Sequence, residues 1–319
     1  MKSPGKGWRV LLRRPASPGD WLFQGAALLA GLSLVGVLAA MAASLLETAR
    51  PALTAFGLGF LFSSVWDPVR EVFGALPAIY GTLLTSAIAI AVAVPVSLGV
   101  AIFLAELAPR WLRTPVSFLV EMLAAIPSVV LGLWGIFVMA PAIYPAEQWL
   151  ERVLGWIPLF RGPIFGGFGF LTGGLILAIM ALPIITAIAR DAILTVPPAQ
   201  KEAMLALGAT RWEAISRAIL PYARSGVIAA GILGLGRALG ETMAVTMVIG
   251  NGYLLTGRLF APGNTMASKI ATQFNEASGL EVNALVELAL VLLAVALIVN
   301  VAGRLLVRRA VGRVPWGGR

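Results

Sequence analysis

Residues 197–221 read PPAQKEAMLALGATRWEAISRAILP and form a polar interruption between two long apolar stretches. Pro198 predicts the start of a short helix, because a proline in the first helical turn loses no hydrogen bond. Gly208 predicts the end of that helix, because glycine adopts the left-handed conformation that residues with a Cβ atom resist. The segment therefore begins with one short helix and a glycine turn.

A second helix is predicted directly after this turn. Thr210 and Glu213 have capping-box spacing, in which each side chain satisfies a free backbone N–H group at the start of a helix. Pro221 predicts the end of this second helix after roughly ten residues, because proline interrupts helical hydrogen bonding. We call residues 197–221, with this helix–turn–helix pattern, the elbow.

The elbow presents a small apolar surface inside a rim of charged residues. The apolar side chains are those of Ala203, Met204, Leu207 and Ala209, and the charged rim consists of Lys201, Glu202 and Arg211. A surface of this kind is typical of a docking site for a partner protein. We therefore expect the elbow to dock a partner rather than to catalyse a reaction.

The composition of the whole chain predicts an all-α polytopic membrane protein. Of the 319 residues 59% are hydrophobic and only 12% are charged, against roughly 25% charged residues in soluble domains. Each apolar run is at least about as long as the ~20 residues that a helix needs to cross a membrane. Six such runs predict six transmembrane helices: 21–46, 72–105, 122–146, 162–189, 225–257 and 282–303.

The positive charges predict the orientation of these helices. Most of the 24 Lys and Arg residues fall in segments on one side, which the positive-inside rule assigns to the cytoplasm. Both termini and the elbow are then cytoplasmic. The net charge of +9 is explained by this orientation, so we expect a membrane-lipid environment and no nucleic-acid partner.

The pattern divides the chain into five parts. These are a cytoplasmic basic tail (1–20), a first transmembrane helix (21–46), an external interfacial segment (47–73), a core of five transmembrane helices that carries the elbow within 196–221 (74–310), and a cytoplasmic tail (311–319). The external segment fits a short interfacial helix or a plain linker. The third transmembrane helix is predicted to run through Pro127, and a re-entrant or interfacial loop is predicted at 141–170.

Several kinds of chemistry are excluded by the residues that the chain lacks. It contains no Cys and no His, which removes thiolate nucleophiles, imidazole bases and the commonest zinc ligands. No glycine-rich nucleotide-binding loop is present either. We therefore expect no catalytic residue, no metal and no cofactor in this chain.

Two charged residues lie inside the fifth predicted transmembrane helix. Arg237 and Glu241 are four residues apart, which places them on one face of a continuous helix. Charge within a membrane is costly, so both must face protein or a polar path. They form either an ion pair that locks the helix in place or the polar lining of a solute path. The Thr242 hydroxyl can then bond either the backbone or a ligand.

The elbow resembles the EAA loop of permeases in ABC importers. That loop has Glu-Ala-Ala, three residues, Gly, nine residues, Ile, one residue and Leu-Pro. Its counterparts here are Glu202, Ala203, Gly208, Leu220 and Pro221, while Met204 and Ala218 replace an Ala and the Ile. The resemblance implies that residues 202–209 couple the chain to an ATPase, namely Glu202, Ala203, Met204, Leu207, Gly208 and Ala209.

A more specific resemblance is to PstC-type permease subunits of phosphate importers. The stretches GLGRALGETMAVTMVIGN (234–251) and IPSVVLG (126–132) carry it, together with the six-helix layout. It implies a type I ABC importer permease fold in a bacterial inner membrane and a phosphate path past Arg237, Glu241 and Thr242. It also implies three kinds of partner: a PstA-type permease, two cytoplasmic ATPase subunits that bind ATP, and an external phosphate-binding protein.

Two alternatives to phosphate import remain open from the residues. One is a permease for another oxyanion, sulfate or molybdate, because a single Arg does not discriminate among tetrahedral anions. The other is an ion-coupled secondary transporter that works without an ATPase.

Overall fold

The structure, a computed structural model, describes residues 18–311, and the predicted tails at 1–20 and 311–319 lie almost entirely outside this range. The described chain is almost entirely helical. Its elements are α2 (Pro18–Phe56), α3 (Gly59–Phe62), β1 (Trp66–Asp67), β2 (Val72–Phe73), α4 (Leu76–Ile102), η1 (Phe103–Leu107), α5 (Arg110–Ala124), α6 (Ser128–Trp134), η2 (Gly135–Met139), α7 (Ala140–Leu154), η3 (Pro158–Phe160), α8 (Phe170–Leu194), α9 (Pro198–Ala206), α10 (Arg211–Ala214), η4 (Ile215–Ile219), α11 (Leu220–Gly240), α12 (Met243–Val248), α13 (Met266–Gln273) and α14 (Leu280–Val311).

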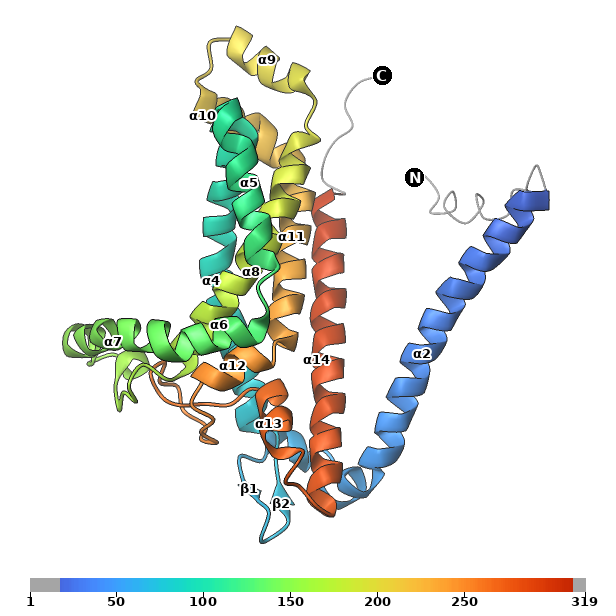
Figure 1. Cartoon of the computed structure of the whole chain (residues 1–319), viewed down its shortest axis with the longest axis vertical. Helices are drawn as coiled ribbons and strands as arrows, with labels where there is room; N and C mark the ends of the chain where they lie inside the picture. Colours follow the sequence, from blue (N-terminus) through green and yellow to red (C-terminus); the bar gives the residue numbers. More distant parts are fainter. Residues whose placement is uncertain (1–17, 312–319) are drawn as a thin grey trace.

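Four long helices, α4, α8, α11 and α14, form an upright bundle (Figure 1). Helix α8 packs against both α4 and α11, and it is the most buried of the long apolar helices. Glycines allow this close packing: a Cβ atom at Gly174 would meet Ile88, and one at Gly234 would meet Ile185. The main apolar core therefore lies along α8.

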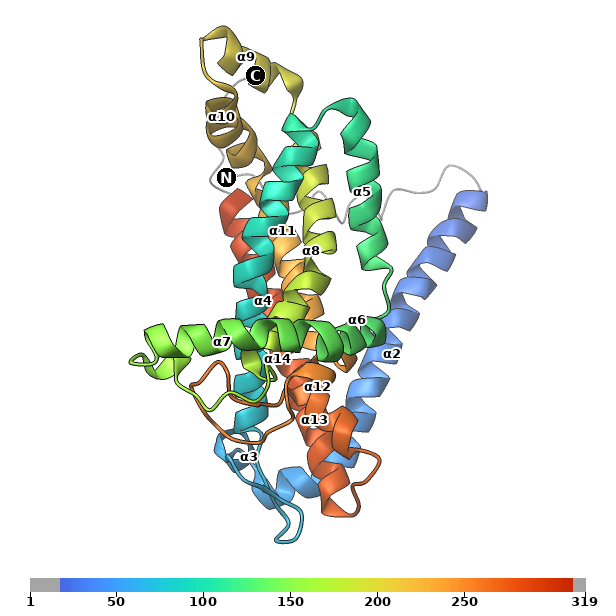
Figure 2. The same ribbon diagram turned by 60° about the vertical axis from the view of Figure 1, so that its left-hand side comes forward.

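Helix α2 stands away from the bundle and meets it near one end only (Figures 1 and 2). It runs to Phe56, well beyond the predicted end at residue 46. The segment that follows contains the short helix α3 and an antiparallel hairpin of β1 and β2. A second apolar cluster joins this region to α13 and α14 through Ala52, Phe60, Phe73, Met266 and Leu288.

The third predicted transmembrane helix is broken at Pro127, so the prediction of one helix through this residue is wrong. Pro127 has an extended ψ of 139° and precedes α6. Proline has no N–H group to donate, and it disfavours helical conformation in the residue before it. As a result α5 runs along the bundle, whereas α6, η2 and α7 run across it (Figure 2). Helix α7 also replaces half of the loop predicted at 141–170.

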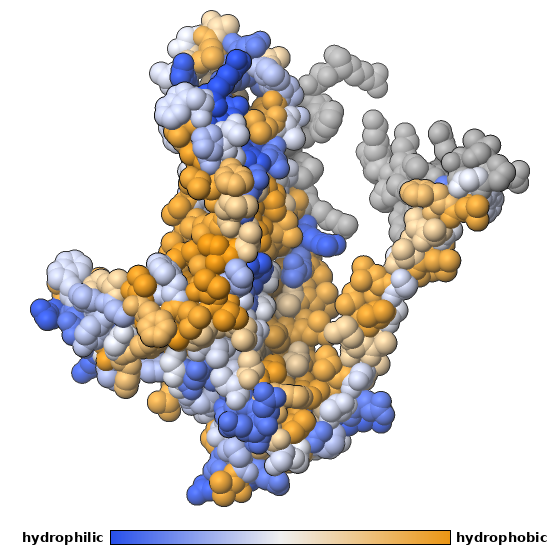
Figure 3. Space-filling view, viewed as in Figure 1, coloured by the Kyte–Doolittle hydropathy of each residue, from blue (hydrophilic) through white to orange (hydrophobic). Residues whose placement is uncertain are grey.

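Six helices in residues 18–311 are long and apolar enough to cross a membrane. They begin at residues 21, 76, 128, 170, 211 and 280. The outer surface of the bundle is strongly hydrophobic along most of its length (Figure 3). The predicted all-α polytopic fold with six helices long and apolar enough to span a membrane is confirmed, although the third of them begins at residue 128 and runs across the bundle (Figure 2).

Candidate functional site

The elbow has the predicted structure at its first turn. Helix α9 begins at Pro198 and ends at Ala206, and Gly208 has a φ of +82°. The elbow forms one end of the molecule, where α9 and α10 extend beyond the long helices (Figure 1). We call this end of the bundle the elbow end.

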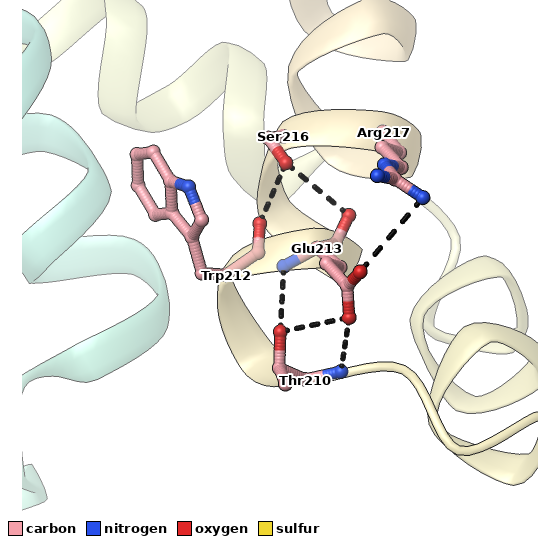
Figure 4. A network of polar contacts seen from close by, with 5 residues as sticks. All are labelled: Thr210, Trp212, Glu213, Ser216 and Arg217. Carbon is pink, nitrogen blue, oxygen red and sulfur yellow. Dashed lines mark hydrogen bonds and ion pairs between the residues drawn. The ribbon is translucent and has the colours of Figure 1, made fainter.

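The predicted capping box at the start of α10 is confirmed (Figure 4). The Glu213 backbone N–H donates to Thr210 Oγ1 at 3.2 Å, and the Thr210 backbone N–H donates to Glu213 Oε2 at 2.9 Å. The Glu213 carboxylate also lies 3.8 Å from the guanidinium of Arg217. These local bonds fix the direction in which the chain leaves the glycine turn.

The sequence predicted that the helix beginning at α10 ends at Pro221, and this prediction is wrong. The helix continues through the π-helical turn η4 into α11. In η4 the backbone N–H of Leu220 donates to the carbonyl of Ile215, five residues back. This wider turn leaves room for the proline ring, which would otherwise press on a carbonyl of the preceding turn. The elbow is therefore joined to α11 by continuous helix.

The residues assigned to ATPase coupling lie on the outer side of the elbow. Glu202, Ala203 and Gly208 are exposed, and Leu207 is 86% exposed. Met204 and Ala209 are partly buried. The elbow end mixes hydrophilic and hydrophobic surface, in contrast to the apolar bundle beneath it (Figure 3). An apolar side chain as exposed as Leu207, beside charged groups, is available to a partner.

Arg237 and Glu241 do not share one continuous helix, so the prediction of a common helical face is wrong. Helix α11 ends at Gly240, and Glu241 has an extended ψ of 128°. Among residues 18–311 no ion pair joins Arg237 to Glu241.

The two residues after the break contact the start of the next short helix. Glu241 Oε1 accepts a long hydrogen bond of 3.4 Å from the Ala244 N–H at the first turn of α12. The Thr242 hydroxyl donates to the Gly240 carbonyl at 3.4 Å, and the Thr246 hydroxyl donates to the Thr242 carbonyl at 2.7 Å. A broken helix with polar groups at the break is tolerated in a membrane protein where it faces protein or a polar cavity.

Within residues 18–311 no three Asp or Glu residues lie close enough to hold a metal ion. Two further contacts join charged side chains, and that of Lys201 with Glu106 was not foreseen from the sequence. The Lys201 ammonium of α9 pairs with Glu106 of η1, and the Arg190 guanidinium lies 3.6 Å from Glu121. For the Lys201–Glu106 contact, the only signal in the sequence is that Glu106 directly follows a long apolar run.

The bundle, the broken fifth helix and the exposed elbow fit one class of protein: a membrane-spanning transport subunit with an exposed helical elbow. The chain belongs to the family of binding-protein-dependent transport system inner membrane components, whose model matches residues 97–312. The matched region includes α8, the elbow, α11 and α14.

Relatives in this family have high identity over most of the chain. The phosphate transport system permease protein PstC of Pasteurella multocida is 48% identical over 278 residues, which cover 86% of this chain and 87% of that protein. The PstC of Mesorhizobium japonicum is 45% identical over 91% of this chain and 90% of its own length. A probable PstC from Methanocaldococcus jannaschii is 38% identical over 80% of this chain and 83% of its own length.

Solved structures of ABC transporters share the fold. A chain of a bacterial alginate ABC transporter superposes with a TM-score of 0.61 at 17% identity, over 95% of this chain and 97% of that one. A chain of the inward-facing MetNI methionine ABC transporter gives 0.56 at 18% identity, over 77% of this chain and 99% of that one. These likenesses confirm the permease fold expected from the sequence.

Proposed function

We propose that this chain is the transmembrane permease subunit of an ATP-driven importer for inorganic phosphate. The observation that carries the proposal is the identity of 44% to 48% with PstC proteins, which extends over most of the chain and includes the elbow and the broken fifth helix. The chain forms half of a translocation path by alternating access. A PstA-type permease forms the other half, and an external phosphate-binding protein delivers the anion.

The energy enters through the elbow. One of the two cytoplasmic ATPase subunits docks on the exposed residues Glu202, Ala203 and Leu207, with Met204, Gly208 and Ala209 shaping the turn behind them. The continuous helix from α10 through η4 into α11 supports this role, because it carries a displacement of the elbow into the bundle. The chain itself is not an enzyme, and ATP binds in the partner subunits.

The phosphate path passes the break between α11 and α12. Arg237 has an exposed side chain on α11, and Glu241 and Thr242 lie at the break itself. A cation beside a membrane-crossing path attracts a phosphate anion, and a single cation leaves the anion free to depart. Selection among tetrahedral anions then depends on the binding protein. Arg237 in this lining role fits the absence of an ion pair with Glu241 within the described chain.

The experiment is uptake by vesicles that contain this chain, its second permease, the ATPase and the binding protein. We expect ATP-dependent uptake of labelled phosphate that excess phosphate inhibits and excess sulfate or molybdate does not. Arg237→Gln should abolish most of this uptake, whereas Arg70→Gln on the exposed hairpin should not change it. Inhibition by sulfate or molybdate as strong as by phosphate would point to another oxyanion. Uptake by this chain alone under an ion gradient would reject the ABC importer.

The orientation has its own test, because the natural chain contains no Cys. Leu207→Cys places a single thiol on the elbow, and Val69→Cys places one on the hairpin at the opposite end of the molecule. With both termini cytoplasmic, an impermeant maleimide added to whole cells should label Val69→Cys and leave Leu207→Cys unlabelled. The reverse pattern would place the elbow outside and reject the proposal.

A further inference from the structure

Helix α9 is connected to the bundle in three ways. Two are covalent, because residues 195–197 join it to α8, and α10 and η4 join it to α11. The third is an ion pair between the Lys201 ammonium of α9 and Glu106 Oε2 of η1, the π-helical turn that follows α4. The two residues are 95 positions apart in the sequence. The pair therefore joins the elbow to a helix that it does not otherwise continue into.

Glu106 lies on a turn that is firmly held by its surroundings. Its neighbours Leu104 and Ala105 are buried, and η1 packs against α8. The Ala108 N–H donates to the Phe103 carbonyl at 2.7 Å, and the Arg113 guanidinium donates to the Ala105 carbonyl at 3.0 Å. A force on the Glu106 carboxylate is thus carried into α4 rather than absorbed by a loose loop.

The pair is also shielded from solvent on one side. The Glu106 side chain is 12% exposed and the Lys201 side chain is 37% exposed. Fully exposed ion pairs contribute little because water and salt screen them, whereas a partly buried pair is screened less. The geometry therefore favours a persistent contact at the point where α9 faces the end of α4.

We infer that the Lys201–Glu106 ion pair makes α4 follow α9 when the partner ATPases move the elbow. This inference rests on the proposed ATP-driven mechanism and names an additional, non-covalent route by which the movement reaches the bundle. Helices α8 and α11 receive the movement through the chain itself, and α4 receives it through Lys201. Helices α4 and α11 both pack on α8 and also contact each other, so the movement reaches three helices that pack together. Both Lys201 and Glu106 are positioning residues in this mechanism.

Two π-helical turns stand where these routes enter the bundle, η1 at the end of α4 and η4 at the start of α11. Single π-helical turns inside α-helices are frequent at functional sites.

The test measures the distance between α9 and α4 in the assembled complex. Spin labels are attached to two introduced cysteines, Ala199→Cys on α9 and Val96→Cys on α4, both at exposed positions. Because the natural chain lacks Cys, no other residue of this chain reacts with the label. With the pair intact, ATP should leave this distance unchanged, because the helices move together. In Glu106→Gln, ATP should shift or broaden the distance distribution, because α9 then moves without α4.

A second readout is the amount of phosphate imported per ATP hydrolysed. We expect Glu106→Gln and Lys201→Gln each to lower this ratio by roughly three- to ten-fold, and the double variant to lower it no further, as for two residues that act through one contact. The exchanged pair Glu106→Lys with Lys201→Glu should restore at least about half of the ratio. Arg70→Gln is the control, because it removes an exposed ion pair, that with Asp67, at the hairpin end of the molecule.

Each outcome of these two measurements either supports or overturns the inference. An unchanged α9–α4 distance in Glu106→Gln overturns the inference, as does an exchanged pair that assembles without restoring the ratio, or an equal loss in Arg70→Gln. If Glu106→Gln fails to assemble, the exchanged pair alone decides. The distance measurement needs ATP but no transported solute. If ATP leaves the wild-type distance unchanged and shifts that of Glu106→Gln, while the wild-type complex imports no phosphate, the proposed substrate is rejected and the inference is supported.

Discussion

The ammonium group of Lys269 lies 4.6 Å from the centre of the Trp66 ring, so a lysine of α13 is held against the β1–β2 hairpin. The Tyr253 ring lies 4.3 Å away as well, and Lys269 is only 4% exposed. Trp66 is fixed in turn, because its indole N–H donates to Glu281 Oε1 at 3.1 Å. This cation–π cluster joins the hairpin, the loop before α13 and the start of α14.

The buried lysine predicts a pH dependence. Burial lowers the pKa of Lys269 from 10.5 to about 8, and the nearby Glu281 carboxylate acts in the opposite direction. Between these two pH values the unfolded chain binds more protons than the folded chain, so stability should rise as the pH increases from about 8 to about 10.5. Between about pH 8 and about pH 10.5, the melting temperature of the wild type should therefore rise relative to that of Lys269→Met.

A direct measurement is the Nζ chemical shift of Lys269 in protein labelled with ¹⁵N-lysine. The other lysines are Lys2, Lys6 and Lys201, and substitution of Lys269 assigns its signal. Trp66→Leu removes one ring face that favours the charged form, so it should lower the pKa of Lys269 further. A titration midpoint at the ordinary lysine value would show that the two rings cancel the cost of burial.

The capping box predicts a local effect at the elbow. Thr210→Ala removes the oxygen that accepts the Glu213 N–H, and the loss of such a cap costs about 0.5–2 kcal/mol. The amide of Glu213 should therefore exchange its proton faster, and ATP-driven uptake should fall because α10 no longer holds the elbow in place. Thr210→Ser keeps the oxygen and should behave as the wild type. Unchanged exchange in Thr210→Ala would contradict the role of this cap.

A substitution of Gly208 in the glycine turn should act through the backbone conformation and not through a steric clash. No atom lies within 4 Å of a Cβ atom placed on Gly208, so only its φ of +82° opposes a side chain. Gly208→Ala should cost about 1–2 kcal/mol in the elbow conformation and reduce ATP-driven uptake. Gly208→Asn should cost less, because asparagine tolerates this conformation.

The matched control for Gly208 is Gly257, which also has open space around it but no left-handed backbone. Gly257→Ala should leave both uptake and assembly with the ATPase unchanged. If Gly208→Ala and Gly257→Ala behave alike, the left-handed conformation of the elbow is not required for coupling.

The features that the sequence predicted correctly depend on local physics. Long uncharged runs locate the spanning helices, and the positions of Pro198, Gly208 and Thr210 determine the elbow through interactions with their immediate neighbours. The permease fold could also be predicted from the sequence, because the residues of the elbow have the spacing of the EAA loop. Residue identities alone were sufficient for these features.

The features that were missed depend on distant or competing interactions. The helix is broken at Pro127, whereas a helix continues past Pro221 through a π-helical turn. The two prolines look equivalent in the sequence. The break at Gly240 separates Arg237 from Glu241, although their spacing fits a helix. The contact of Lys201 with Glu106 joins segments that only the fold brings together.

A last prediction concerns the close approach of α4 to the loop before α13. A Cβ atom at Gly81 would clash with the backbone oxygen of Asn264. That loop has little freedom to move, because the Met266 N–H donates to the Thr82 hydroxyl of α4 at 2.9 Å and Ser268 donates to the Asn264 side chain. Gly81→Ala should therefore destabilise the protein by about 1–3 kcal/mol through overpacking.

The same helix supplies the control for this prediction. Gly99 also lies in α4, but no atom outside its own helix backbone comes within 4 Å of a Cβ atom there. Gly99→Ala should stabilise the helix by about 0.5–1 kcal/mol, because alanine loses less backbone entropy than glycine. The thermal stability of the two variants in detergent should therefore change in opposite directions. A Gly81→Ala variant as stable as Gly99→Ala would mean that the loop yields to α4, and that the hydrogen bond from Met266 to Thr82 does not fix it.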